Sequence, residues 1–188
     1  MPGFTFVTSN DHKVKTAEAV CGPANITFDH KRIDLLEIQA ADGEEVARHK
    51  VQQAFEACNS PVVVTDDNWN IPALRGFPGP YMRYVNQWFE PEDFVNLTRG
   101  LADRQIIMRH ILAYKDANKE KIFAVDIPAT MLKEPRGESL ITHFKVISLD
   151  DGKSSAAEAE ADGSSVIASQ ANAWHDFCDW FQNHLANR

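Results

Sequence analysis

The run PVVVTDDN, residues 61–68, constrains the fold more than any other stretch of this chain. Three consecutive valines predict a buried strand, because β-branched side chains pack well inside a sheet. Asp66 and Asp67 follow at the carboxyl end of that strand. Two carboxylates in such a place are costly unless a positive group neutralises them, and Mg²⁺ bound to a phosphorylated ligand would do so. A plain turn is the alternative, since Asp-Asp-Asn also suits one.

Strand and helix patterns are mixed along the 188 residues, without an internal repeat. Strands are expected at residues 4–8, 105–114, 122–132 and 139–149, with one or two more within 25–38. Helices are expected at 11–21, behind the caps Ser9 and Asn10, and at 44–57, 92–101 and 171–185. Residues 150–165 are small and polar and predict a loop. These patterns leave α/β and α+β open, and the length suits one domain, residues 1–188, with two lobes.

Composition narrows the classes of function. The formal net charge of −8 argues against a surface for nucleic acid or anionic membranes. The N-terminus lacks the basic and apolar regions of a signal peptide, and no apolar run reaches membrane-spanning length. Cys21, Cys58 and Cys178 are far apart and never in C-x-x-C spacing. We therefore expect reduced thiols and a cytoplasmic location.

Several familiar catalytic patterns are missing. The segment GKSS at Gly152 lacks the second glycine of a P-loop, because position 147 is Ile147. Neither G-x-G-x-x-G nor G-x-S-x-G occurs, which argues against a dinucleotide fingerprint and a serine-hydrolase elbow. No two histidines stand at H-x-x-x-H spacing, so a zinc site has little support.

Three groups of residues remain as candidates for a site. The first is TSNDHK, Thr8–Lys13, where free N–H groups at a helix start would attract an anion; a helix cap with an exposed lysine is the alternative. The second is the pair Asp66 and Asp67. The third is the helix GEEVARHKVQQAF, in which Glu44 or Glu45 would supply a carboxylate and Lys50 a cation; a solvated helix face is its alternative.

Together these groups resemble the inosine triphosphate pyrophosphatase family. The family's opening T-G-N-x-x-K is matched by Thr8 to Lys13, and its acidic segment and helix lysine by DGEEVARHKVQQA with Lys50. Its strand ending E-D-[ST] is matched by Thr65, Asp66 and Asp67, and its G-x-P-G-x-Y loop by GFPGPY, residues 76–81. Order and spacing agree from about residue 4 to residue 100.

The resemblance implies an α/β fold in which an elongated mixed sheet with flanking helices forms two lobes around a central cleft. It implies Mg²⁺-dependent hydrolysis of nucleoside triphosphates to monophosphate and pyrophosphate, and a homodimer. Asp66 would be the catalytic carboxylate and a metal ligand, with Glu44 or Glu45 beside it. The residues expected to bind the substrate are Thr8, Ser9, Asn10, Lys13, Lys50, Asp67 and Arg83, and the loop at residues 74–81 would stand as a wall beside them.

The second half departs from the family pattern. Lys145-Val146 stands where the family carries an Asp-Pro that helps recognise the base. The segment at residues 162–174, DGSSVIASQANAW, lacks the late lysine and the S-H-R triplet, and Thr65 replaces the usual glutamate. Two hypotheses follow. The first is a pyrophosphatase with altered or relaxed base selection, and the second is a relative that binds a nucleotide or a protein partner without turnover.

Overall fold

The computed structural model of this chain describes residues 3–162 and 166–186. It divides into two compact units. The first comprises Met1–Asp66, His110–Val125 and Gln170–Arg188, and the second comprises Asp67–Arg109 and Asp126–Ser169. A seven-stranded sheet has the strand order β2-β1-β3-β5-β6-β7, with β4 paired to β3 off this path. The strands β3, β5 and β6 each contribute residues to both units.

The first unit begins as a parallel arrangement of strands. Strand β1 (Phe4–Val7) pairs in parallel with β2 (Phe28–Lys31) and with β3 (Val62–Asn70). Helix α1 (Asp11–Cys21) connects β1 to β2, and helix α2 (Gly43–Cys58) leads into β3. The end of β5 (Gln105–Lys115), the turn after it and the start of β6 (Glu120–Met131) also belong to this unit. Helix α6 (Val166–Ala186) is the last element of the chain.

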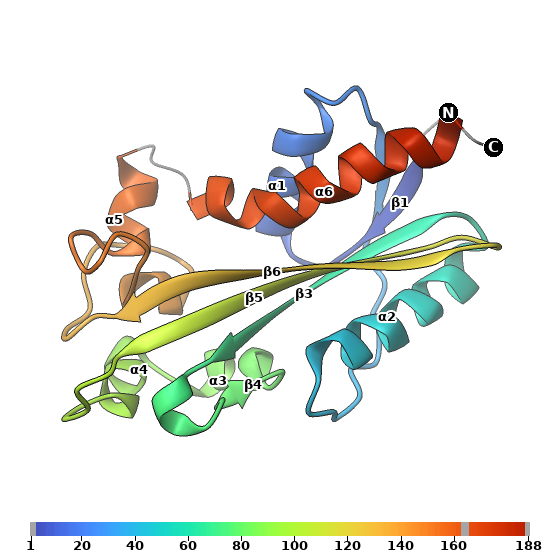
Figure 1. The fold of residues 1–188 in the computed structure, drawn as a ribbon. Coiled ribbons are helices and arrows are strands. Elements are labelled where there is room, and N and C mark those ends of the chain that lie inside the picture. Colours follow the sequence, from blue (N-terminus) through green and yellow to red (C-terminus); the bar gives the residue numbers. More distant parts are fainter. Residues whose placement is uncertain (1–2, 163–165, 187–188) are drawn as a thin grey trace. The chain divides into compact units, whose positions relative to one another are not determined.

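Alternating side chains give the sheet of the first unit two apolar faces. On one face Phe6, Val63 and Leu112 pack with α1 and α6 in an aromatic-rich core. On the other face Val62, Val64 and the buried face of α2 form a second core. Figure 1 shows α1 and α6 on one side of β1 and β3, with α2 on the opposite side. Successive residues of a strand point to opposite faces, so the valine run of β3 serves both cores.

The second unit holds the short elements. They are η1 (Pro72–Leu74), β4 (Pro78–Gly79), α3 (Met82–Trp88), α4 (Pro91–Leu97), η2 (Thr142–Lys145), β7 (Ile147–Ser148) and α5 (Ala156–Ala161). Trp69, at the end of β3, packs against Phe94 of α4 with ring centroids 5.6 Å apart. Strand β4 pairs antiparallel with the end of β3, and β7 pairs antiparallel with β6. The predicted α/β class with a mixed sheet is confirmed.

Three predictions of local structure are wrong. Asp66 and Asp67 were expected at the carboxyl end of their strand or in a turn, but β3 continues to Asn70 and both residues lie within it. The segment at residues 139–149 was expected as one strand, but it forms the 3-10 helix η2 followed by the two-residue strand β7. Residues 150–165 were expected as a loop, but helix α5 lies within them. Ser155 caps α5 by accepting from the backbone N–H of Glu158, whose carboxylate accepts in return from the N–H of Ser155. This reciprocal capping box stabilises a helix that is only six residues long.

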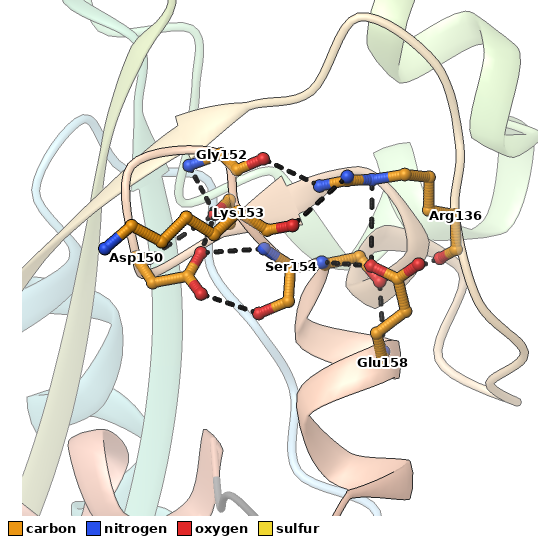
Figure 2. Close-up of polar contacts among 8 residues, drawn as sticks. Arg136, Asp150, Gly152, Lys153, Ser154 and Glu158 are labelled. Atoms are coloured by element: carbon orange, nitrogen blue, oxygen red, sulfur yellow. Dashed lines mark hydrogen bonds and ion pairs between the residues drawn. The ribbon is translucent and has the colours of Figure 1, made fainter.

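The turn before α5 is held by side chains (Figure 2). Asp150 accepts hydrogen bonds from the hydroxyls of Ser148 at 2.6 Å and Ser154 at 2.7 Å. The Arg136 guanidinium donates to the carbonyls of Gly152 and Lys153. The segment GKSS therefore forms part of a cross-linked turn that leads into α5.

Candidate active site

The first unit contains a buried ionic group, the Lys50 cluster, formed by Glu37, Lys50 and Asp66. The Lys50 ammonium lies 2.9 Å from Asp66 Oδ1 and 3.1 Å from Glu37 Oε1. It also donates to the carbonyl of Thr65 at 3.4 Å. Its side chain is 11% exposed and that of Asp66 is 12% exposed. An ammonium has three N–H donors, and these three acceptors account for all of them.

The periodicities of helix and strand bring Lys50 and Asp66 together. On α2, Lys50 belongs to the buried face that also carries Ala47, Val51 and Ala54. On β3, Asp66 follows Val62 and Val64 at alternate positions, and these valines form the core that α2 covers. The carboxylate of Asp66 thus points to the side of the sheet where Lys50 lies. The sequence predicted these two residues as site members, and the structure brings them into contact.

The electrostatics of the Lys50 cluster favour the charged form of lysine. Burial alone would lower the pKa of Lys50, but the attraction of Asp66 and then of Glu37 outweighs it, so the pKa is raised above its ordinary value of 10.5. Lys50 is therefore an ammonium ion at neutral pH. Removing either carboxylate would leave a buried cation with less compensation.

Glu37 is the member of this cluster that the sequence analysis missed. It lies in the segment between β2 and α2, which has no regular secondary structure. The neighbouring Leu36 is tied to α2 by two hydrogen bonds with the Gln53 side chain, at 3.0 and 2.8 Å. Ile33 and Leu35 pack against the core under α2. Ile33, Leu35 and Glu37 stand at alternate positions of the sequence. This alternation is the signal that could have predicted that Glu37 lies on the same side of the segment as the two apolar residues that face α2.

The predicted metal ligands Glu44 and Glu45 lie elsewhere on α2. Glu44 forms an ion pair with Arg48 one turn along the helix, at 3.3 Å. Glu45 is exposed in the first turn. No group of three or more His, Cys, Asp or Glu side chains suited to a metal ion occurs in the part of the chain that the structure describes. The metal-binding roles of Asp66, Glu44 and Glu45 stay predictions.

The segment Thr8–Lys13 forms the start of α1, as predicted. Asn10 is the N-cap, and its side chain accepts from the backbone N–H of His12 at 2.9 Å. The Thr8 hydroxyl accepts from the N–H of Asn10 at 3.2 Å. Ser9 is exposed, and Lys13 lies half-buried in the first turn of the helix. The predicted role of Asn10 as a helix cap is confirmed. Anion binding by this segment stays a prediction.

Thr65 stands on the opposite side of the sheet from Asp66. It is 5% exposed, and its hydroxyl has no hydrogen-bond partner among the described residues. Alternation along β3 puts it on the face of Val63, which α1 and α6 cover.

The remaining predicted binding residues belong to the second unit. Asp67 continues β3 half-buried, and Arg83 is exposed in the first turn of α3. The loop before α3 folds back so that Pro78 and Gly79 pair with the end of β3. Gly76 and Gly79 both have positive φ, +96° and +58°, a conformation that glycine adopts without strain. The strand pairing and the two glycines therefore account for the conformation of the loop. That the loop forms a wall beside the phosphates stays a prediction.

The segment that replaces the family's Asp-Pro is also in the second unit. Lys145 forms an ion pair with Glu138 at 3.0 Å, and Phe144 is buried. The His143 Nδ1 lies 2.9 Å from the side-chain oxygen of Asn86, and its ring is nearly perpendicular to that of Trp69, with the ring centroids 5.2 Å apart. The other departure, at residues 162–174, includes residues 163–165, which lie outside the described part of the chain.

The fold and the Lys50 cluster define an α/β protein with a buried lysine that contacts two carboxylates, one of them on the central strand β3. A family model described as the Ham1 family matches residues 4–180. The chain therefore belongs to the Ham1 family, and the family resemblance that the sequence analysis identified is confirmed.

Individual relatives agree with this assignment. The chain is 27% identical to a dITP/XTP pyrophosphatase of Methanopyrus kandleri over 184 residues, covering 97% of this chain and 98% of the relative. It is 34% identical to one of Ignicoccus hospitalis over 137 residues, covering 71% of this chain and 72% of that protein. A solved HAM1 protein from Coxiella burnetii has the same fold, with a TM-score of 0.83 and 16% identity over 97% of this chain and all of that one.

Proposed function

We propose that this protein is a Mg²⁺-dependent nucleoside triphosphate pyrophosphatase with relaxed selection of the base. The observation that carries the proposal is the Lys50 cluster. Its ammonium group would attract a phosphate, and its two carboxylates are the ligands that a hard cation such as Mg²⁺ prefers. Membership of the Ham1 family supports the reaction class, since the curated relatives above are pyrophosphatases by name.

The donor set of the cluster fits magnesium. Mg²⁺ in phosphoryl-transfer sites is commonly held by one or two carboxylates together with substrate phosphates and water. Glu37 and Asp66 are two such carboxylates, both within ion-pair distance of the same nitrogen. We therefore assign the second metal-binding carboxylate to Glu37 rather than to Glu44 or Glu45, because Glu44 pairs with Arg48 and Glu45 is exposed. The bound ion would neutralise phosphate charge and polarise the phosphoryl group.

The reaction breaks the anhydride bond between the α- and β-phosphates. The oxygen of a water molecule bonds to phosphorus, and the pyrophosphate leaves with the electrons of the broken bond. In this proposal Asp66 orients the water and accepts its proton. Lys50 stays protonated and stabilises charge on the phosphates. Lys13 and the N–H groups at the start of α1 bind phosphate oxygens. Substrate binding by Asp67 and Arg83, which belong to the second unit, stays a prediction.

Contacts within the second unit support relaxed selection of the base. A site that hydrogen-bonds its ligand rejects analogues that lack the partner groups, so strict selection requires polar groups aimed at the base. Here Lys145 pairs with Glu138 and Phe144 is buried in the unit's core. These contacts support a site in which the residues at and next to the family's Asp-Pro position make contacts within the unit and do not bind the base.

We also propose a cytoplasmic homodimer. Free thiols at Cys21, Cys58 and Cys178 support a reducing compartment. The family resemblance supports the dimer. Separately, no helix in the described residues is long and apolar enough to cross a membrane.

The direct experiment is pyrophosphate release from a panel of nucleoside triphosphates by the purified protein. We expect release with Mg²⁺ and none after chelation with EDTA. Nucleoside triphosphate binding without any release, measured by calorimetry under the same conditions, would instead identify the non-catalytic relative that the sequence analysis left open. Neither binding nor release from any member of the panel would contradict both.

A further inference from the structure

Two cysteines lie in contact within the core of the first unit. The Sγ atoms of Cys21 and Cys178 are 3.7 Å apart, although the residues are 157 positions apart in the chain. Cys21 is the last residue of α1, and Cys178 belongs to α6. Figure 1 shows these two helices on the same side of the sheet. The contact therefore joins two helices that are distant in sequence.

The thiols are surrounded by the aromatic-rich core and take no part in the proposed phosphate chemistry. Cys21 is fully buried and Cys178 is 3% exposed, in the same cluster as Phe4, Phe177 and Phe181. The third cysteine, Cys58, is half-buried at the end of α2 and packs against the other core of this unit. The chain thus offers one thiol pair in contact and one separate thiol as an internal reference.

We propose that Cys21 and Cys178 form a redox modification site, which a small peroxide oxidises to a reversible disulfide within the chain. A disulfide needs its sulfur atoms at about 2.0 Å, so the pair must close by less than 2 Å from the observed contact, on the order of one side-chain adjustment. Because oxidation of a thiol depends on its exposure, the burial of both thiols restricts the oxidant to a reagent as small as hydrogen peroxide and disfavours bulky disulfide reagents.

The chemistry balances with hydrogen peroxide as the oxidant. The Cys178 thiolate attacks one peroxide oxygen, the O–O bond breaks, and the hydroxide that leaves takes up a proton to become water. The resulting Cys178 sulfenic acid is then attacked by the Cys21 sulfur, which forms the S–S bond and displaces the hydroxyl as a second water. Two thiols are oxidised by two electrons, and one peroxide molecule is reduced.

The environment of the two thiols is unequal in a way that suits this order. The hydrogen bond with Cys21 lowers the pKa of Cys178, against the opposing effect of burial. The hydrogen bond with Cys178 and then burial raise the pKa of Cys21. Cys178 is therefore the thiol that ionises first, and the thiolate is the form that reacts with peroxide.

A disulfide at this position would constrain most of the chain. It would close a loop between residues 21 and 178, and long loops lose the most freedom in the unfolded state. Oxidation should therefore raise the melting temperature, by roughly 5–15 °C for a chain of this length. Reduction with dithiothreitol should restore the original value.

The test measures thiols and melting temperature before and after treatment with hydrogen peroxide. We expect the number of titratable thiols to fall from three to one, a linked pair of peptides containing Cys21 and Cys178, and a melting temperature that rises and returns with dithiothreitol. The matched control Cys58→Ala should show the same linked peptides and the same shift in melting temperature, with its thiols falling from two to none. The variant Cys21→Ala should show neither the linked peptides nor the shift.

Three outcomes would overturn the proposal. The first is that all three thiols survive peroxide that fully oxidises the urea-unfolded chain. The second is that thiols are lost only as sulfinic or sulfonic acids, or in links through Cys58 between molecules. The third is that linked peptides form without any change in melting temperature. Thiol counts, linked peptides and melting temperatures of the wild type and Cys58→Ala distinguish these outcomes from the expected one, even if Cys21→Ala does not fold.

Discussion

Replacing Lys50 by methionine tests the Lys50 cluster as a structural and electrostatic unit. Methionine keeps most of the length of the side chain but removes its charge and its three N–H donors. The ammonium lies within 3.1 Å of Glu37 and 2.9 Å of Asp66, and its side chain is only 11% exposed. The variant therefore leaves two largely buried carboxylates without the cation that compensates them.

The expected loss is large because the group is buried. Removing one partner of a buried ion pair typically destabilises a protein by about 3–5 kcal/mol, mostly through the uncompensated charge that remains. The raised pKa of Lys50 means that its contribution is complete below its unfolded value of about 10.5 and is lost only as the pH rises through the still higher folded value. A measurement at pH 7.5 thus records the full effect.

Urea unfolding of Lys50→Met and wild type at pH 7.5, followed by circular dichroism, gives the difference in unfolding free energy. Lys15→Met is the matched control, because Lys15 is exposed on α1, and it should change the free energy by less than about 0.5 kcal/mol. If Lys50→Met also changes it by no more than this, the cluster is not a coupled ionic unit, and its assignment as the centre of the site loses its basis.

Three further predictions concern phosphate binding, the base and acid stability. Lys13→Ala should weaken nucleoside triphosphate binding by about 1–3 kcal/mol in calorimetry, the scale of a charge-assisted hydrogen bond, and unchanged affinity would identify Lys13 as a surface lysine. Inosine and adenosine triphosphates should compete nearly equally, and a strong preference for inosine would show that other residues rebuild the base site. Hydrogen bonds from Ser148 and Ser154 hold the pKa of Asp150 below its ordinary value of 3.8. Its stabilisation is therefore complete above that value and declines as the pH falls toward the lower folded value, so the deficit of Asp150→Asn relative to wild type should be smaller at pH 2.5 than at pH 7; an equal deficit at both pH values would contradict this.

The parts of the site that periodicity determines were predictable. Helix α1 has the bounds that its caps and the following Gly22 predict, Asp11–Cys21. The proximity of Lys50 and Asp66 could be predicted, because Lys50 lies on the apolar face of its helix and Asp66 on the apolar face of its strand, and these two faces pack in one core. Local rules suffice here because the amphipathic pattern and the buried position agree.

The errors and omissions arose where tertiary contacts override local preference. Residues 139–149 are rich in β-forming residues, yet only Ile147–Ser148 pair with β6, because Phe144 is buried within a 3-10 turn instead. Helix α5 was missed although Ser155 and Glu158 stand at the spacing of a capping box. Glu37 was missed because its segment is irregular and is positioned by contacts distant in sequence, those of Leu36 with Gln53 and of Glu37 with Lys50.

The most direct test of the proposed function is Mg²⁺-dependent pyrophosphate release by the wild type and by Asp66→Asn. The substitution keeps the shape of the side chain and removes its charge, so circular dichroism should still report a folded protein. We expect the wild type to release pyrophosphate only with Mg²⁺, Asp66→Asn to be slower by about a hundredfold or more, and the exposed control Asp34→Asn to match the wild type. Release by Asp66→Asn at the wild-type rate would contradict the assignment of Asp66 and, with it, the Lys50 cluster as the active site.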